Sequence, residues 1–394
     1  MRVLIATATA GGGHLAAAAA LDEAWRSSRP QDVVERLDVV KFFSPLHRKI
    51  HADGYVQLVE RAPELWGLVF GKTDNPKVAQ RLNRLKRSFP SASRLRFLRY
   101  VRQFKPDAVL CTHYLPLETL GAEQSKRRTR SDRSHSWEAP FVVSIITDFE
   151  AHALWMEPCV DLYCVAAEQT KARLSARGAR SENIVATGIP IASKFSSRPN
   201  PNAIRRKMGL RDDQPTLLVL SGGSGMGPVA EILTELDKVD RTFQTVVVTG
   251  RNETLRRDLA GQERCHPTHV LGYASNMHEL MAIADLILTK PGGLTTSEVL
   301  AMGKPIFILN PIPGQEAANS DFLLEHGAAT KVNRVEDLPY RMDQLLGDDR
   351  KLKELAQASR KLGRPKAAHD ICAEVYSRFT DRSGVTDSTV GTRS

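Results

Sequence analysis

Two glycine-rich segments, each lying between a predicted strand and a predicted helix, have the composition of phosphate-binding loops. The first, residues 221–227, follows the apolar run 217–220, and the second, residues 289–298, follows the run 286–288. Glycines allow main-chain amides to approach an anion, and the N-terminus of the following helix adds about half a positive charge. Both segments therefore favour a diphosphate ligand; a plain tight turn is the alternative for the first.

The first loop matches neither of two common nucleotide-binding fingerprints. It lacks the Gly-Lys-Ser/Thr ending of a P-loop. Its spacing is G-x-G-x-G, and no acidic residue ends the next predicted strand, 246–249, to hold a ribose. These features argue against a P-loop NTPase and against a dinucleotide-binding enzyme.

Polar side chains stand beside these loops. Glu298 falls within about the first turn of the helix that follows the second loop, where its carboxylate could accept both hydroxyls of a ribose or could simply suit the helix dipole. Gln315 and Glu316 follow the strand 306–309 and open a further helix. Adjacent amide and carboxylate groups at such a position suit a polyhydroxylated ligand such as a sugar, with a simple helix start as the alternative.

The elements that position these residues alternate between strand and helix in both halves of the chain. Strands are predicted over residues 3–7, 33–39, 108–111, 142–146, 162–165 and 183–186, and again over 217–220, 245–248, 270–271, 286–288 and 306–309. This alternation predicts the α/β class, with parallel sheets covered by helices on both faces. In such sheets the ligand lies outside the carboxyl ends of the strands. The natural site is then a cleft between two domains.

The length of 394 residues exceeds one ordinary domain and predicts two. We expect an N-terminal domain over residues 1–195, a polar linker at 196–202 and a C-terminal domain over 203–362. A helix over residues 363–380 is expected to pack back on the N-terminal domain, and a polar tail over 381–394 to be disordered.

The apolar stretch 3–21 contains His14 as its only ionisable side chain, and could be read as a signal peptide or a short membrane span. Three consecutive glycines and a high alanine content instead predict a buried strand, a glycine loop and a helix. No other stretch approaches the length of a span, so any membrane contact is expected to be peripheral.

Composition excludes several classes of protein. With 42% hydrophobic and 25% charged residues, the chain is not collagen, coiled coil or wholly disordered. The five cysteines include no C-x-x-C pair, which argues against a zinc knuckle and a disulfide framework and fits a reducing cytoplasm.

Basic residues are concentrated between residues 77 and 105, which contain ten lysines and arginines and no acidic residue, within a net charge of +10. Apolar residues recur there at helical spacing, which predicts two basic amphipathic helices divided at Pro90. This basic segment has three possible interpretations. It could bind a membrane surface, bind a nucleic acid, or be the solvated face of ordinary packed helices. No nucleic acid is expected, because no recognisable RRM, KH or zinc-finger pattern accompanies the charge. The second basic run, 126–133, is predicted to be a loop. The residues assigned to a membrane surface are Arg81, Arg84, Arg94, Arg96, Arg99 and Arg102.

An ordered set of motifs from about residue 3 to residue 330 resembles one known family. The set comprises Gly-Gly-Gly-His at 11–14, Thr-Asp-Phe at 147–149 with His152 and Trp155, the segment 222–228, Gly-Tyr at 272–273 with Asn276 and Met277, the segment 289–298, and the segment 312–316 with Asn319. It resembles the monogalactosyldiacylglycerol synthase and processive diacylglycerol glucosyltransferase group, which is related more distantly to the glycosyltransferase that makes lipid II.

The resemblance implies a GT-B fold, in which two Rossmann-like domains face each other across a cleft, with the donor nucleotide on the second domain. Uracil would lie against Gly272, Tyr273 and Met277, the ribose against Glu298, and the sugar against Gln315 and Glu316. The full set of residues implied to contact a UDP-sugar is Gly12, Gly13, Gly223, Ser224, Gly225, Met226, Gly272, Tyr273, Asn276, Met277, Pro291, Gly292, Gly293, Leu294, Thr295, Glu298, Gln315, Glu316 and Asn319. The loop Gly-Met-Gly-Pro is similar to plant galactosyl enzymes and Lys-Pro-Gly-Gly to bacterial glucosyl ones, so UDP-galactose and UDP-glucose both remain open.

The same resemblance implies an inverting hexosyl transfer to diacylglycerol at the inner face of the cell membrane. Inversion by direct displacement needs a base, and a histidine with a pKa near 6.5 suits that role at neutral pH. His14 is the leading candidate, with Asp148 and His152 as alternatives or as partners that orient it. No D-x-D pair and no His/Cys cluster with metal-ligand spacing occurs, so metal independence and no cofactor are predicted.

Three other functions remain compatible with these residues. The enzyme could transfer N-acetylglucosamine to a polyprenyl-linked or other lipid acceptor, or could be a UDP-sugar epimerase. The chain could also be a regulator that binds a UDP-sugar or lipid without turnover.

Overall fold

The computed structural model describes residues 1–9, 11–44, 62–75, 77–79, 92–129, 139–223, 225, 227–309 and 311–383. The chain divides into two compact units: Met1–Ser193 with Lys366–Ser394, and Lys194–Pro365. The first unit therefore includes both the start of the chain and its last described helix. Each unit is built around its own six-stranded parallel sheet.

The sheet of the first unit has the order β2-β1-β3-β4-β5-β6. Its strands are β1 (Arg2–Thr7), β2 (Val33–Asp38), β3 (Ala108–Cys111), β4 (Phe141–Ile145), β5 (Leu162–Cys164) and β6 (Ile184–Val185). Side chains alternate between two buried clusters: Val3 and Ile5 of β1 belong to one, and Leu4 and Ala6 to the other. This alternation is the period of two that an extended strand imposes, and burial on both faces is typical of a parallel sheet.

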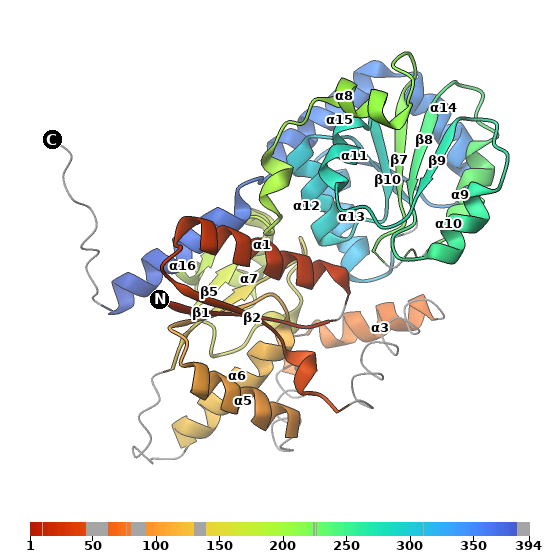
Figure 1. Cartoon of the computed structure of the whole chain (residues 1–394). Coiled ribbons are helices and arrows are strands. Elements are labelled where there is room, and N and C mark those ends of the chain that lie inside the picture. Colours follow the sequence, from red (N-terminus) through yellow and green to blue (C-terminus); the bar gives the residue numbers. More distant parts are fainter. Residues whose placement is uncertain are drawn as a thin grey trace. The chain divides into compact units, whose positions relative to one another are not determined.

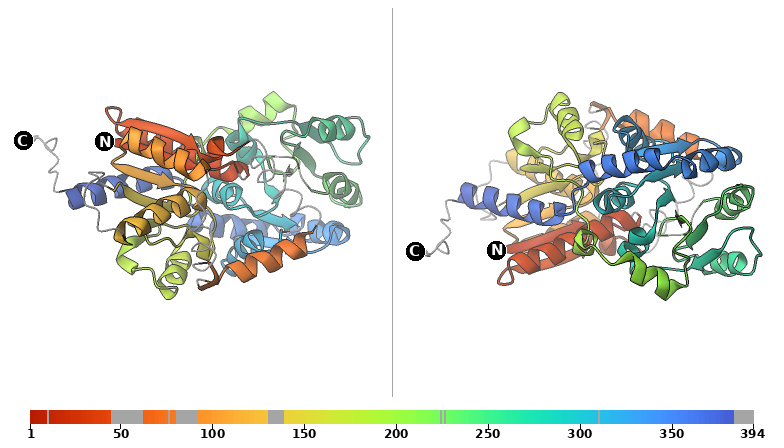
Figure 2. Two further views of the ribbon diagram at one scale, coloured as in Figure 1. Left: turned by 90° about the horizontal axis from the view of Figure 1, so that it is seen from below. Right: turned by 90° about the horizontal axis from the view of Figure 1, so that it is seen from above.

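Helices cover both faces of this sheet (Figure 1). On one face α1 (Gly12–Ser28) lies beside α16 (Ala367–Ser383) (Figure 2). Both helices pack with Val3 and Ile5 of β1. On the other face lie α5 (Ala92–Phe104), α6 (Tyr114–Thr129) and α7 (Glu168–Ala176). Helix α3 (Pro63–Thr73) also belongs to this unit.

The sheet of the second unit has the order β12-β11-β10-β7-β8-β9. Its strands are β7 (Thr216–Leu220), β8 (Gln244–Val248), β9 (Thr268–Leu271), β10 (Leu286–Thr289), β11 (Ile306–Leu309) and β12 (Ala329–Val332). Its helices are α8 (Pro201–Met208), α9 (Val229–Leu236), α10 (Glu253–Ala260), α11 (Met277–Ile283), α12 (Gly293–Met302), α13 (Gln315–Glu325), α14 (Leu338–Leu346) and α15 (Asp349–Leu362).

Each sheet has a position at which the strand order reverses direction. In the first unit β1 is flanked by β2 on one side and β3 on the other, and in the second β7 is flanked by β8 and β10. The connections leaving such a pair of strands diverge to opposite faces and open a crevice at the carboxyl ends, where open α/β sheets bind their ligands. The crevices at β1/β3 and β7/β10 are therefore the expected ligand-binding sites of the two units.

Several predicted boundaries differ from the structure. The predicted linker at 196–202 overlaps α8, which begins at Pro201 with the Asn200 side chain as its N-cap. The predicted loop at 126–133 is helical up to Thr129, at the end of α6. The helix predicted to end at residue 380 continues to Ser383 within α16, and residues 384–394 of the predicted tail lie outside the described residues.

The stretch 3–21 forms β1 and the start of α1, as predicted. In the parts of the chain that the structure describes, no helix has the length and apolarity needed to cross a membrane.

Candidate active site

His14 lies in the first turn of α1, directly after β1. Gly11 precedes the helix with φ of 101°, a conformation that favours glycine. The short connection brings the imidazole to the carboxyl end of β1, and Thr112, directly after β3, supplies its hydrogen-bond partner. His14 therefore occupies the β1/β3 crevice.

Hydrogen bonds to His14 determine which ring nitrogen carries the proton. Nδ1 lies 2.8 Å from the carbonyl oxygen of Thr112 and 3.0 Å from Oγ1 of Thr147. Because a carbonyl oxygen can only accept, Nδ1–H must be the donor. The neutral ring then carries its lone pair on Nε2, which is the nitrogen that can take a proton from another molecule.

The surroundings of His14 favour this neutral form. Burial lowers the pKa of the imidazole below 6.5, and the opposing attraction of the Asp148 carboxylate does not fully offset it. The ring of His113 meets that of His14 edge-on with centroids 4.7 Å apart, and the ring of Trp155 lies 6.3 Å away. At neutral pH, His14 is therefore a neutral imidazole held in a fixed tautomer beside an acidic side chain.

His152, the alternative base, has a structural role in this unit. Its Nδ1 accepts from the main-chain N–H of Leu154 at 3.1 Å, so Nε2 carries the proton and donates to the carbonyl oxygen of Phe70 at 3.1 Å. The ring is 6% exposed and packs against Phe70 with centroids 4.5 Å apart. Burial also lowers its pKa below the usual value. Because both nitrogens bind main-chain groups, the structure argues against the predicted role of base and assigns His152 to joining α3 to the loop 147–155.

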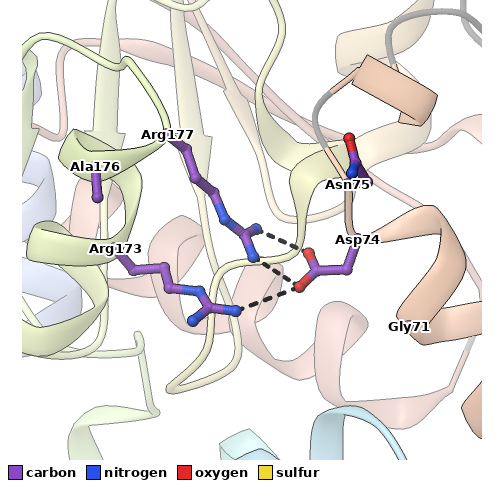
Figure 3. Close-up of a pocket in the computed structure, with 6 residues that line it drawn as sticks. All are labelled: Gly71, Asp74, Asn75, Arg173, Ala176 and Arg177. Atoms are coloured by element: carbon purple, nitrogen blue, oxygen red, sulfur yellow. Dashed lines mark hydrogen bonds and ion pairs between the residues drawn. The ribbon is translucent and has the colours of Figure 1, made fainter.

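Charged residues reinforce the same junction (Figure 3). Arg177, directly after α7, donates through Nη1 and Nη2 to the two oxygens of Asp74 at 2.8 and 2.7 Å, and Arg173 lies 3.5 Å from that carboxylate. Asp74 also accepts from the Ala153 main chain at 2.9 Å, and Arg177 donates to the carbonyl oxygen of Ala151 at 2.6 Å. Burial alone would raise the pKa of Asp74, but the hydrogen bonds from Arg177 and Ala153 outweigh it and lower the pKa.

Asp74, Arg173 and Arg177 line a pocket of about 440 Å³ together with Gly71, Asn75 and Ala176. The charges within it are balanced, because Arg173 also forms an ion pair with Glu150. The balance points to a scaffold for the loop 147–155, which carries Asp148, rather than to a site for a free anion.

In the second unit, the first glycine loop follows β7 at the β7/β10 crevice. Gly225 has φ of 68°, and a Cβ there would lie 2.2 Å from the carbonyl oxygen of Thr249 and 2.5 Å from Cβ of Asn252. By contrast, a Cβ at Gly223 would meet nothing within 4 Å. The loop is therefore fixed against the segment after β8 on one side and open on the other. Ser224 and Met226 lie outside the described residues.

The second glycine loop joins β10 to α12, and Gly292 caps the helix that begins at Gly293. Pro291 and Gly293 are buried, whereas Leu294 and Thr295 are half-buried in the first turn. Asn319 of α13 is fully buried and donates through Nδ2 to the carbonyl oxygen of Pro291 at 3.0 Å. Asn319 thus positions the loop, and the donor contact implied for it stays a prediction.

Lys290 also lies in this crevice, although it was not among the predicted site residues. A Cβ placed at Gly227 would lie 3.5 Å from its Cε and 3.7 Å from its Nζ, so the ammonium lies beside the first glycine loop. Lys290 also lines a small cavity with Ser221, Gly227 and Thr289. Its position in the motif, directly before the Pro-Gly-Gly turn, was the available signal.

The residues predicted to hold the nucleoside lie in the loop after β9, at the start of α11 and in α12. Tyr273 is 66% exposed, and the guanidinium of Arg251 lies 5.5 Å from the centre of its ring. Asn276 is exposed and donates to Glu279 at 2.7 Å, and Met277 is half-buried at the start of α11. Burial raises the pKa of Glu298 to about 8, against the attraction of Lys194.

Gln315 and Glu316 are half-buried in the first turn of α13. One carboxylate oxygen of Glu316 accepts from the main-chain N–H of Ile312 at 2.9 Å and thereby closes the turn before the helix. Gly314, which precedes this turn of helix, has φ of 98°. The geometry keeps both side chains at the carboxyl end of β11, next to β10.

The predicted membrane residues fall into three groups. Arg96, Arg99 and Arg102 are exposed on α5, and Arg94 is half-buried. Arg81 and Arg84 lie outside the described residues. Within the described part of the chain, no group of three or more His, Cys, Asp or Glu residues is arranged to hold a metal ion.

Comparison with known proteins places these features in a family. Residues 14–191 match the family model of monogalactosyldiacylglycerol (MGDG) synthase, and residues 216–371 match the C-terminal domain of glycosyltransferase family 28. The processive diacylglycerol beta-glucosyltransferase of Bacillus thuringiensis is 31% identical over 376 residues, which cover 94% of this chain and 92% of the relative. The chain belongs to the diacylglycerol glycosyltransferase family. The resemblance found in the motifs is thus confirmed.

Solved structures with the same fold extend beyond the diacylglycerol glycosyltransferase family. Anabaena HepE in complex with UDP-glucose is 14% identical, with a TM-score of 0.57 and coverage of 96% of this chain and 100% of HepE. The UDP-GlcNAc 2-epimerase of Neisseria meningitidis bound to UDP-GlcNAc is also 14% identical, with a TM-score of 0.60 and coverage of 96% and 100%. The GT-B fold is confirmed, and because epimerases share it, membership of the diacylglycerol glycosyltransferase family is what distinguishes the two classes.

Proposed function

We propose that this protein is an inverting hexosyltransferase that moves galactose or glucose from a UDP-sugar to 1,2-diacylglycerol at a membrane surface. The observation that carries the proposal is the state of His14: a neutral imidazole with its lone pair on Nε2, at the switch point of the first sheet, in a member of this family. Glycine loops at the switch point of the second sheet supply main-chain donors for a diphosphate.

The proposed reaction is a single displacement. The acceptor hydroxyl oxygen forms a bond to the anomeric carbon of the hexose, while the bond from that carbon to the phosphate oxygen breaks. Nε2 of His14 takes the hydroxyl proton, and UDP departs with the electron pair. Asp148 stabilises the imidazolium that forms, because its charge already raises the pKa of His14.

Stabilisation of the departing UDP is assigned to the second unit. Main-chain amides of the loops at Gly223 and Gly292–Gly293 and the N-terminus of α12 would meet the diphosphate, and the ammonium of Lys290 would add a full positive charge beside it. Glu298 would accept the ribose hydroxyls, and Gln315 and Glu316 would hold the sugar. Tyr273, Gly272 and Met277 would face the uracil.

The proposal is tested by incubating the protein with diacylglycerol vesicles and labelled UDP-glucose or UDP-galactose, followed by lipid extraction. Label in the organic phase supports hexosyl transfer and identifies the donor. Epimerised nucleotide sugar in the aqueous phase would support the epimerase alternative. If transfer occurred only from UDP-N-acetylglucosamine to a polyprenyl-linked acceptor, the protein would be an N-acetylglucosaminyltransferase. If the protein bound its ligands without forming any product, it would be a regulator.

Activity is expected to be unchanged by EDTA. Main-chain amides and helix N-termini can stabilise a departing diphosphate without a divalent cation. The measurement is the initial rate of transfer with and without the chelator. Loss of transfer in EDTA that Mg²⁺ or Mn²⁺ restores would contradict this mechanism of leaving-group stabilisation.

We further propose that α3 and α5 contribute to a membrane-facing surface of the first unit, so that the enzyme acts as a peripheral protein at the inner face of the cell membrane. Arg96, Arg99 and Arg102 are exposed on α5, and Leu65, Leu68 and Val69 are exposed on α3 at helical spacing. Exposed basic and apolar side chains together are typical of proteins that lie on anionic lipid.

Replacing Arg96 and Arg99 with glutamine is expected to weaken binding to vesicles that contain anionic lipid by about tenfold or more, since each basic residue contributes about 1 kcal/mol at such a surface. Vesicle co-sedimentation at low and high salt measures the effect. Arg350→Gln, which removes an exposed arginine of the second unit, is the matched control and should bind as the wild type does. Equal binding of the wild type to neutral and anionic vesicles would contradict the proposal.

A further inference from the structure

Lys194 is a charged residue near the proposed donor site that the mechanism above does not use. It is the first residue of the second unit and lies in a short 3-10 helix, Ser193–Ser196. The next residue, Phe195, is almost completely buried, and its ring meets that of His278 of α11 edge-on with centroids 6.2 Å apart. The main chain at Lys194 is therefore anchored beside α11, although its own side chain is exposed.

The ammonium of Lys194 reaches the loop between β9 and α11. Its Nζ donates to the carbonyl oxygen of Ser275 at 2.7 Å. This loop carries Gly272, Tyr273 and Asn276, which are the residues assigned to the uracil side of the donor. The hydrogen bond therefore fixes the end of the loop at which the nucleoside would bind.

The same ammonium acts on Glu298. Burial raises the pKa of Glu298 to about 8, and the charge of Lys194 is the opposing influence that lowers it. Three charged or titratable groups on neighbouring elements are engaged elsewhere: Glu279 accepts from Asn276, His278 lies against Phe195, and Arg360 of α15 lies over Gly303 beyond the far end of α12. Lys194 is thus the cation that favours the ionised form of Glu298.

We propose that Lys194 is a positioning residue of the donor site, which holds the uracil-side loop through Ser275 and supplies the countercharge for Glu298 when that carboxylate accepts the ribose hydroxyls. This inference rests on the proposed function, because it assigns Lys194 to the same UDP-sugar site.

A pH dependence follows from these two roles. A carboxylate accepts both ribose hydroxyls, whereas a protonated carboxyl group has lost part of its acceptor capacity. Because Glu298 is mostly protonated at pH 7, binding of a nucleoside should release a proton, and affinity should rise with pH until it levels off above about pH 8. Without Lys194, the pKa of Glu298 is higher, so the same rise should occur at higher pH.

The test is calorimetric titration of UDP and of uridine into the full-length wild type, Lys194→Met, Glu298→Gln and the double variant between pH 6.5 and 9.5. Lys194→Met is expected to weaken both ligands by about three- to tenfold at pH 7, since one pKa unit corresponds to a factor of ten, and by less at pH 9. Lys194→Arg should restore most of the affinity. The loss of affinity in the double variant should be smaller than the sum of the two single losses, which would show that the two residues are coupled.

Lys238→Met removes an exposed lysine elsewhere in the same unit and should leave both affinities unchanged. The inference would be overturned if Lys194→Met bound UDP and uridine as tightly as the wild type at pH 7, or if the losses in the double variant were additive. If the wild type still binds UDP in that case, the proposed function stands. Failure of the wild type to bind UDP would overturn both.

Discussion

Replacing His14 with alanine is expected to lower kcat for hexosyl transfer by about 10²–10⁴-fold, the usual contribution of a general base. Nδ1–H of His14 donates to the carbonyl oxygen of Thr112, so the lone pair that can accept a proton lies on Nε2. The alanine variant lacks this proton acceptor. Affinity for UDP, measured by calorimetry, should change little, since the donor loops belong to the other unit. The measurement is kcat with saturating donor and acceptor.

His152→Asn is the matched control for this prediction. His152 joins Phe70 to Leu154 through its two ring nitrogens, so its loss should lower the midpoint of thermal unfolding more than it lowers kcat of the folded enzyme. The base would have to be another residue if kcat of His14→Ala were within a few-fold of the wild-type value. The same would hold if the His152 variant folded normally and lost more of its kcat than His14→Ala does.

The pH profile of kcat gives an independent check on the same residue. Burial lowers the pKa of His14, and only the neutral ring can accept a proton, so activity should fall on the acid side, below pH 6.5. Asp148→Asn removes the charge that raises this pKa. The acid limb should therefore move to still lower pH, while the maximal rate falls because the imidazolium loses its stabilising partner.

The second large effect is expected from Gly225→Ala. A Cβ at this position would lie 2.2 Å from the carbonyl oxygen of Thr249, and the φ of 68° is one that residues with a Cβ rarely adopt. The loop would have to move, and its main-chain amides would leave the positions proposed for the diphosphate. Affinity for UDP should fall by at least about tenfold, given a conformational cost of about 1–2 kcal/mol before any clash.

Gly261→Ala provides the control in the same unit, because its φ is negative and the nearest atom to an added Cβ is 3.8 Å away. It should bind UDP as the wild type does. Calorimetry with UDP measures both variants. Unchanged affinity of Gly225→Ala would show that this loop does not hold the diphosphate.

Local sequence patterns predicted much of the fold. Strands β3 and β11 have the predicted bounds, because continuous β-branched and apolar runs next to helical spacing leave few alternatives. Strand β12, with the sequence Ala-Thr-Lys-Val, was missed. It lies at the edge of its sheet, and its two central residues are only half-buried, so its apolar pattern is weak.

The candidate site was only partly accessible from the sequence. His14 and the glycine loops could be selected because a short stretch of sequence shows both their residue types and their position between a strand and a helix. Thr112 was not selected, and Thr147 was noted only as part of a motif, although both lie within hydrogen-bond distance of Nδ1 of His14. Only the strand order β1-β3-β4 brings the ends of their strands beside α1. For His152, residue type alone could not distinguish a base from a histidine that joins two segments.

The most direct test of the central claim is the anomeric configuration of the glycolipid, determined by proton NMR on product extracted from a reaction with the α-linked UDP-sugar. A single displacement, with His14 taking the acceptor proton as the sugar–phosphate bond breaks, predicts that the product is the β-anomer. An α-linked product would mean that configuration is retained, and would contradict the one-step mechanism.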